Sequence, residues 1–394
     1  MVPALACLAL AWVAAPALSS QPYLPGAVDF EQSLGPVRAA GALPNAKLVR
    51  SSRRAGRGPI SYRSAVLAAP KRFDLVGLAG EMRPLELRAR DSGGAWSDWV
   101  EAADGSPVYF GGADEVQLRT RGWRPSGRLH YVNVSGTTSA AGGLLTGVRE
   151  AINSAFISAG SLVDPIAEAA PTRPEIVTRS EWGANLTRGG CPPRERPSYG
   201  VVKAGVIHHT VTANDYSETE APGIVLGICR YHRNANGWND IGYQALVDRF
   251  GNLYAGRAGG IRKAVIGAQA QGFNAQSTAI SSIGTHTKEA PTAAAQASIV
   301  DYLAWKLSVH GLTATGKTTM TSAGGDLSRY PAGRRVRLNK VIGHGTLGYT
   351  ACPGVALERL IVGLRRKIQA RIEASGGPGD PPITTPPGGG VEPR

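Results

Sequence analysis

A short glycine-rich stretch near the C-terminus, residues 341–354 (VIGHGTLGYTACPG), constrains this chain more than any other feature. An apolar run typical of a strand leads into His344, and Cys352 follows before an amphipathic helical pattern begins. Imidazole and thiolate are both good zinc ligands. A third ligand must come from elsewhere, and His208 and His209 end another apolar run upstream. The pattern predicts a zinc site of two histidines and one cysteine with an open fourth position, which suits hydrolysis better than a structural role.

Strand-like and helix-like segments alternate over residues 175–374, which we interpret as one domain. The strand-like segments are 201–208, 243–247, 253–255 and 278–284. The helical segments are 219–233, 292–310 and a last one after Gly354. Mixed strands and helices predict an α/β fold with one mixed central β-sheet flanked by helices.

The remaining boundaries follow from composition. We expect a signal peptide (1–19), an irregular N-terminal segment (20–70), a β-rich module (71–136), a linker (137–174) and a disordered Pro/Gly-rich tail (375–394). Alternating apolar residues and turn signals predict that the module is small and all-β, as in a sandwich. Trp96 and Trp99 in this module either pack in its core, which we favour, or stack on sugar rings.

We interpret the N-terminal residues as a signal for export. Residues 1–19 have a short apolar core that ends in small residues, although they lack the usual basic start. The stretch is too short for a membrane span, and no other stretch of the sequence qualifies as one. We therefore expect a secreted or cell-wall-associated protein that loses Cys7 with the signal. In such a chain Cys191 and Cys229 form either a disulfide or two buried thiols, and the sequence leaves both open.

The chain has a formal net charge of +14, which is compatible with anionic partners. Such a charge attracts nucleic acid, acidic membranes or acidic cell-wall polymers, or it simply keeps the chain soluble. We expect that anionic cell-wall polymers are one partner of the chain and that nucleic acid is not. Basic residues crowd the last predicted helix: Arg359, Arg365, Arg366, Lys367 and Arg371.

One motif points to a function that we reject. Residues 311–318 (GLTATGKT) match the phosphate-binding loop letter for letter. That loop works only between a strand and a following helix, because the backbone N–H groups and the helix N-terminus hold the phosphates. Here a helical pattern precedes the motif and a strand-like pattern follows it. We expect no nucleotide, and we interpret Gly311 and Gly316 as a helix cap and a turn.

Four motifs in order reveal a resemblance to a known family: VIHHT (206–210), WNDIGY (238–243), GNLYAGR (251–257) and TACPG (350–354). With them, the region from about Arg179 to Glu373 resembles the type-2 N-acetylmuramoyl-L-alanine amidases and the related peptidoglycan recognition proteins. It looks most like exported actinobacterial members, which often carry a β-rich module upstream.

The resemblance implies a zinc hydrolase that cuts the amide bond between N-acetylmuramic acid and the L-Ala of peptidoglycan stem peptides. Carried over by position, the zinc ligands are His208, His344 and Cys352. Tyr243 matches the family's active-site tyrosine, and Thr350 falls where catalytic members carry a Lys or a Thr. The Tyr243 hydroxyl would donate to a developing oxyanion, and Thr350 would orient water or donate to the same oxygen. No glutamate stands in an obvious general-base position.

Several positions depart from the family pattern. Gly345 follows His344 where the family commonly has Arg, Ala255 stands in place of a Glu, and Gln269 stands in place of a His. The strand after Thr278 is also more polar than usual. These departures touch groove or supporting positions rather than the proposed ligands.

Two other functions compete with the amidase. A binding module of the same fold would hold peptidoglycan without cutting it, but that class usually lacks the cysteine ligand, and Cys352 is present. A structural zinc domain on a cell-surface protein would want a fourth protein ligand. Beyond His344, which is already counted as a ligand, no further Cys or His stands near Cys352 in the sequence.

Overall fold

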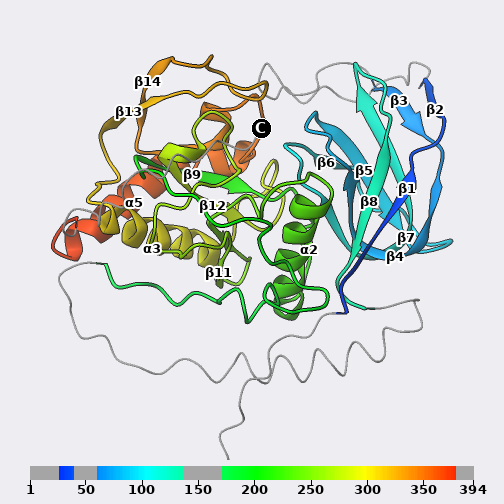
Figure 1. The fold of residues 1–394 in the computed structure, drawn as a ribbon, viewed down its shortest axis with the longest axis horizontal. Helices are drawn as coiled ribbons and strands as arrows, with labels where there is room; N and C mark the ends of the chain where they lie inside the picture. The colour runs from blue at the N-terminus through cyan, green and yellow to red at the C-terminus, as the bar shows by residue number, and fades with distance from the viewer. Residues whose placement is uncertain (1–25, 40–59, 137–170, 379–394) are drawn as a thin grey trace, which may run out of the picture.

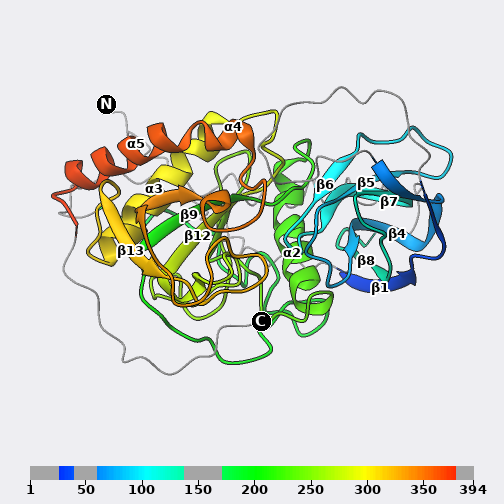
Figure 2. The same ribbon diagram turned by 90° about the horizontal axis from the view of Figure 1, so that it is seen from above.

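The computed structural model describes residues 26–39, 60–136 and 171–378, which form two units packed side by side (Figure 1). A β-rich module comes first in the chain and an α/β domain second. The helix α2 (Ala221–Asn234) lies between the two units in both views (Figures 1 and 2). The predicted signal peptide and most of the predicted linker and tail fall outside the described residues.

The module is an eight-stranded antiparallel sheet that branches at its longest strand. Its strands are β1 (Val28–Ser33), β2 (Val37–Ala39), β3 (Ile60–Ser64), β4 (Leu67–Leu78), β5 (Leu85–Arg90), β6 (Val100–Ala102), β7 (Val108–Arg121) and β8 (Arg128–Asn133). The order is β1-β8-β4-β7-β3-β2, and β5 and β6 extend from β7. Register shifts between β4 and β7 bend both strands. The bent strands therefore pair with neighbours in both halves of the sheet.

Inward-facing residues of this sheet form one core. In β5 the side chains of Leu85, Leu87 and Ala89 are buried and alternate with half-buried ones, as the sequence pattern predicted. The prediction of an irregular segment over residues 20–70 is wrong for its described part, because β1, β2, β3 and the start of β4 lie there. These strands are short or separated by Gly- and Arg-rich sequence, which hides their alternation.

Arginine side chains cover Trp96 and Trp99, two of the three tryptophans of the module. The guanidinium groups of Arg88 and Arg90 lie 4.4 and 4.5 Å from the ring centroid of Trp96. Those of Arg119 and Arg88 lie 4.2 and 4.7 Å from the ring centroid of Trp99. Both rings are only half-buried. The interpretation as core residues is therefore wrong, and cation–π stacking occupies the faces that a sugar would need.

The second unit has the predicted mixed sheet flanked by helices. Its strands are β9 (Ala204–His209), β10 (Ala245–Val247), β11 (Leu253–Ala255), β12 (Ser277–Ser282) and β15 (Val341–Gly343), in the order β11-β10-β12-β9-β15. All adjacent pairs are parallel except β10 with β11. The helices α3 (Ala293–Val309) and α5 (Ile361–Ala374) share one core with Ile207 and Ile280, while α2 shares another with Leu246 and Ala279.

The segment that resembles a phosphate-binding loop has the element order that the sequence predicted. The helix α3 precedes it, and Gly311 follows with a φ of 67°. The strand β13 (Lys317–Thr321) comes after it and pairs with β14 (Arg335–Asn339). No helix N-terminus therefore follows the glycines.

Two of the basic residues in the last helix have partners within the domain. Arg365 donates to the carbonyl of Val341, and Arg371 pairs with Asp301. Arg359, Arg366 and Lys367 are exposed. Among the described residues, no helix combines the length and the apolar character needed to cross a membrane.

A shared apolar core joins the two units. Leu75, Tyr109 and Val132 of the module belong to the same buried cluster as Ile224 and Ile228 of α2. Arg230 and Asn234 on the same helix both bond to the carboxylate of Asp29. The units are therefore fixed to each other by buried apolar contact as well as by charge.

Alanine at Gly227 of α2 tests how closely the units fit. A Cβ there would lie 2.3 Å from a methyl carbon of the buried Leu75. We expect Gly227→Ala to lower the free energy of unfolding by ~1–3 kcal/mol through overpacking. The matched control is Gly363→Ala on α5, where a Cβ meets nothing within 4 Å. There the higher helix propensity of alanine should add ~0.5–1 kcal/mol. Denaturant unfolding measures both, and stabilisation by both would contradict close packing.

Candidate metal and catalytic site

Three side chains from separate parts of the chain meet at one edge of the central sheet. His208 is near the end of β9, and His344 begins the turn of 3-10 helix that follows β15. These strands are parallel neighbours, with Gly343 paired to Ile207, so their carboxyl ends lie together. Cys352 enters from the loop before α4 (Val355–Glu358). One ligand atom from each of these three residues lies within 4.8 Å of the other two.

The distances suit a small cation held between these side chains. The His208 Nδ1 atom is 3.6 Å from the Cys352 Sγ atom, and the two imidazole centroids are 4.5 Å apart. Two ligand atoms of a tetrahedral zinc ion lie roughly 3.3 to 3.7 Å from each other. The donor set also matches zinc, which takes imidazole nitrogen and thiolate sulfur.

A glutamine fixes the ring of His208. The side-chain amide of Gln269 donates from Nε2 to the Ser277 hydroxyl, so its Oε1 atom faces His208 as an acceptor. The Nε2 atom of His208, 2.7 Å away, is then the protonated one, and the Nδ1 lone pair is left for Cys352 and a cation. Hydrogen bonds of this kind orient metal-binding histidines. Gln269 thus replaces the usual histidine without leaving the site unsupported.

Burial keeps both imidazoles neutral. Desolvation is the largest cause that lowers the pKa of His208 and of His344. The Nδ1 atom of His344 is buried and has no hydrogen-bond partner among the described residues. Desolvation also raises the pKa of the Cys352 thiol. A cation between the three side chains would satisfy the His344 nitrogen and offset the cost of a buried thiolate, so these residues fit zinc.

The two residues predicted to be catalytic lie beside this cluster. The Tyr243 ring is 5.2 Å from that of His208, and burial raises the pKa of its hydroxyl, which stays protonated as a donor. Thr350 accepts a hydrogen bond from the Cys352 amide at 3.0 Å. His209, the other candidate ligand, faces away, because its Nδ1 atom accepts a bond from the His286 amide.

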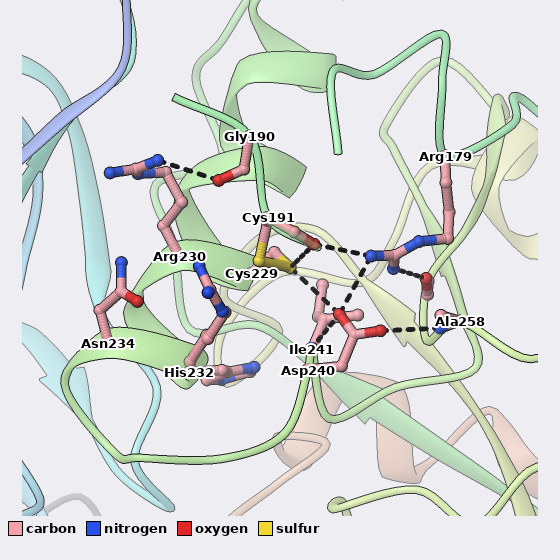
Figure 3. The surroundings of a disulfide bond; sticks show 12 residues. Arg179, Gly190, Cys191, Cys229, Arg230, His232, Asn234, Asp240, Ile241 and Ala258 are labelled. Atoms are coloured by element: carbon pink, nitrogen blue, oxygen red, sulfur yellow. Dashed lines mark hydrogen bonds and ion pairs between the residues drawn. A yellow bond between two sulfur atoms is a disulfide. The ribbon is translucent and has the colours of Figure 1, made fainter. Parts of the chain in front are cut away.

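A disulfide supports the segment that carries Tyr243 (Figure 3). Cys191 and Cys229 are joined, which answers the question that the sequence left open. The nearby Asp240 is buried and accepts hydrogen bonds from the amides of Ile241 and Ala258. Arg179 lies 3.2 Å from the same carboxylate. Cys191, Cys229 and Asp240 lie close enough together to hold a metal ion. Because the two cysteines are bonded to each other, we interpret this group as a structural support and not as a metal site.

Some site residues were not predicted from the sequence. Gln269 was seen only as a departure, although its position after Gly267 and Ala268 was a signal of a supporting role. Asp104 and Ser106 come from the β-rich module. In the sequence, Asp104 was only part of an Asp-Gly turn signal, and Ser106 was not singled out. The Asp104 carboxylate accepts a hydrogen bond from Thr350 at 2.5 Å, and the Ser106 hydroxyl lies 3.4 Å from that of Tyr243.

Removal of the Gln269 amide tests its supporting role. We expect Gln269→Ala to weaken zinc binding by ~10–100-fold, because His208 loses the partner that fixes its ring. Competition with a chromogenic chelator measures the affinity directly. Gln296→Ala on α3, where the side chain bonds only to a backbone carbonyl, is the matched control and should leave affinity unchanged. Equal affinities for the two variants would show that His208 needs no such support.

Comparison with known proteins places this geometry in a family. Residues 198–355 match the family model described as N-acetylmuramoyl-L-alanine amidase. The chain is 32% identical over 182 residues to peptidoglycan-recognition protein SC2 of Drosophila simulans, which covers 45% of this chain and 80% of that protein. It is also 32% identical over 134 residues to the N-acetylmuramoyl-L-alanine amidase of Homo sapiens, over 33% of this chain and 22% of the human one.

Solved structures also resemble about half of the chain. Peptidoglycan recognition protein LE, solved in complex with tracheal cytotoxin, covers 47% of this chain and 91% of its own at 28% identity, with a TM-score of 0.37. The sequence matches are the stronger finding. Through them, the chain belongs to the family of N-acetylmuramoyl-L-alanine amidases and peptidoglycan-recognition proteins.

Proposed function

We propose that this protein is an exported, zinc-dependent amidase that cleaves the bond between N-acetylmuramic acid and the L-Ala of peptidoglycan stem peptides. The observation that carries the proposal is the buried cluster of His208, His344 and Cys352, with the hydroxyl-bearing Tyr243 beside it. The names of the relatives support the substrate class, since they refer to peptidoglycan recognition and to this amidase activity.

Export is part of the proposal. The apolar pattern of residues 1–19 supports it. The Cys191–Cys229 disulfide supports it independently, because disulfides persist mainly in oxidising compartments outside the cytoplasm. We also propose that the exposed basic residues of α5 help to hold the protein on anionic cell-wall polymers, through attraction that salt would weaken.

Each side chain of the site would have a separate role in amide hydrolysis. Zinc, when bound by the three ligands, supplies a Lewis acid that polarises a carbonyl and activates water. Gln269 keeps the His208 lone pair directed at the cluster. Tyr243 holds a proton that its hydroxyl can donate as negative charge develops on the carbonyl oxygen. Thr350, held by the Cys352 amide, offers a second hydroxyl to the same region.

Cleavage of purified muropeptides tests the function. We expect the mature protein to release the stem peptide from muramic acid, identified by mass, and to lose this activity in a chelator until zinc is restored. Cys352→Ser should lose most of the bound zinc and the activity together.

The outcomes separate the competing functions. Muropeptide binding without cleavage would identify a recognition protein instead of an enzyme. Full zinc stoichiometry in both Cys352→Ser and His344→Ala would rule out the metal site.

Tyr243→Phe tests the oxyanion donor. The variant keeps the ring and its packing, so zinc content and thermal stability should hold, while turnover should fall ~10²–10³-fold because the lost bond forms in the transition state. Tyr302→Phe, which removes a buried hydroxyl in the core between α3 and the sheet, is the matched control. A Tyr243→Phe rate within a few-fold of wild type would make Tyr243 a packing residue.

A further inference from the structure

A tight turn of the β-rich module reaches the candidate site. Residues 103–106 lie between β6 and β7, and the Ser106 amide donates to the Ala103 carbonyl at 3.0 Å. Asp104 and Gly105 both have a positive φ, 56° and 72°, which is the geometry of a type I′ turn and favours an Asp-Gly pair. Asn236, which follows α2, donates to the Gly105 carbonyl at 2.7 Å. The turn is thus a fixed structure that presents Asp104 and Ser106 to the domain.

This turn engages both residues proposed to be catalytic. The Asp104 carboxylate accepts a bond from the Thr350 hydroxyl at 2.5 Å and lies 3.8 Å from the unpartnered Nδ1 atom of His344. The Ser106 hydroxyl lies 3.4 Å from that of Tyr243. The module therefore supplies partners to the polar groups that would otherwise face the reacting amide.

With the turn in this place, the cluster has almost no exposed surface. His208 is 1% exposed, Cys352 and Tyr243 are each 6% exposed, and His344 is 8% exposed. A muropeptide must place its lactyl carbonyl against these atoms, and a glycan polymer carries bulky groups on both sides of that carbonyl. Such a substrate cannot reach the site while the turn occupies it.

We propose that the turn of residues 103–106 is an intramolecular plug, so that the β-rich module holds the amidase domain in a closed state. This inference rests on the proposed function, because it takes the cluster as the place where substrate is cut. The Asp104 carboxylate presents an oxygen to Thr350 where the substrate carbonyl would otherwise do so. Substrate then gains access only when the module shifts on α2.

The contacts that seat the plug extend well beyond it. Asp29, on β1, bonds to Arg230 and Asn234 of α2. Tyr109 donates to Glu220 at 2.7 Å. A plug held in this way can be loosened by a substitution far from the cluster of His208, His344 and Cys352. Such a substitution tests the plug and leaves the site itself intact.

Alkylation of Cys352 in the zinc-depleted full-length protein measures access without relying on activity. Mass mapping of the peptide that contains Cys352 gives the rate. We expect Asp104→Gly, which suits the positive φ and removes the side chain, to raise this rate several-fold. Asp29→Ala should also raise it. Asp98→Ala, at an exposed position of the same module, is the control that should leave it unchanged.

A second variant separates occlusion from charge, since the Asp104 carboxylate also disfavours the Cys352 thiolate. Asp104→Asn keeps the size and an acceptor for Thr350, so its alkylation rate should stay near that of wild type. Equal increases in Asp104→Asn and Asp104→Gly would assign the effect to charge and overturn the plug. Unchanged alkylation in Asp104→Gly and Asp29→Ala would overturn it as well.

Muropeptide cleavage by the zinc-loaded proteins gives the second comparison. The plug predicts faster cleavage by both Asp104→Gly and Asp29→Ala. Slower cleavage by Asp104→Gly, despite a more accessible Cys352, would make the turn part of the catalytic machinery and overturn the plug. If no variant cleaves but alkylation increases as expected, the proposed function fails while the occlusion of the cluster by the turn stands.

Discussion

Parallel pairing of β9 with both of its neighbours is the constraint on which the candidate site depends. Ile207 pairs with Gly343 on one side and with Ile280 on the other. This register fixes both the position of His208 and the face of the sheet to which its side chain points. A shift of the register by one residue would turn His208 to the opposite face and bring His209 in its place. The apolar side chains of β9, buried on both faces of the sheet, make such a shift costly.

The helix α2 has a second role that its length alone would not suggest. Most of its residues are buried, including Ile224, Leu226 and Tyr231, because one side covers the central sheet and another meets the module. A helix with so many buried residues needs cover on more than one side. The fit is close at Gly77 as well, where any side chain would collide with the Tyr231 ring. The module therefore packs closely against the domain in the closed arrangement that the structure describes.

Local pattern and motif order were enough to predict the central sheet, its helices and the residues that meet in the cluster. His344 and Cys352 lie close in sequence, and His208 ends a clear apolar run, so their chemistry was visible in short windows. The contacts of Asp104 were not visible in this way, because they span more than two hundred positions and depend on how two units dock. The role of Gln269 was hidden for a related reason. A glutamine that supports a ligand carries no pattern of its own, and only its bond to Ser277 reveals the direction of its amide.

The unpaired Cys352 has a consequence for how the chain matures. The described residues contain one disulfide, Cys191–Cys229, and one free thiol, so oxidation has to pair two of these three cysteines and spare Cys352. Thiolates exchange with disulfides readily, and a metal ion that takes Cys352 early would withdraw it from that exchange. Under the proposed export and zinc binding, zinc supply during export would then govern the yield of correctly bonded protein, apart from any part that the metal plays in the proposed reaction.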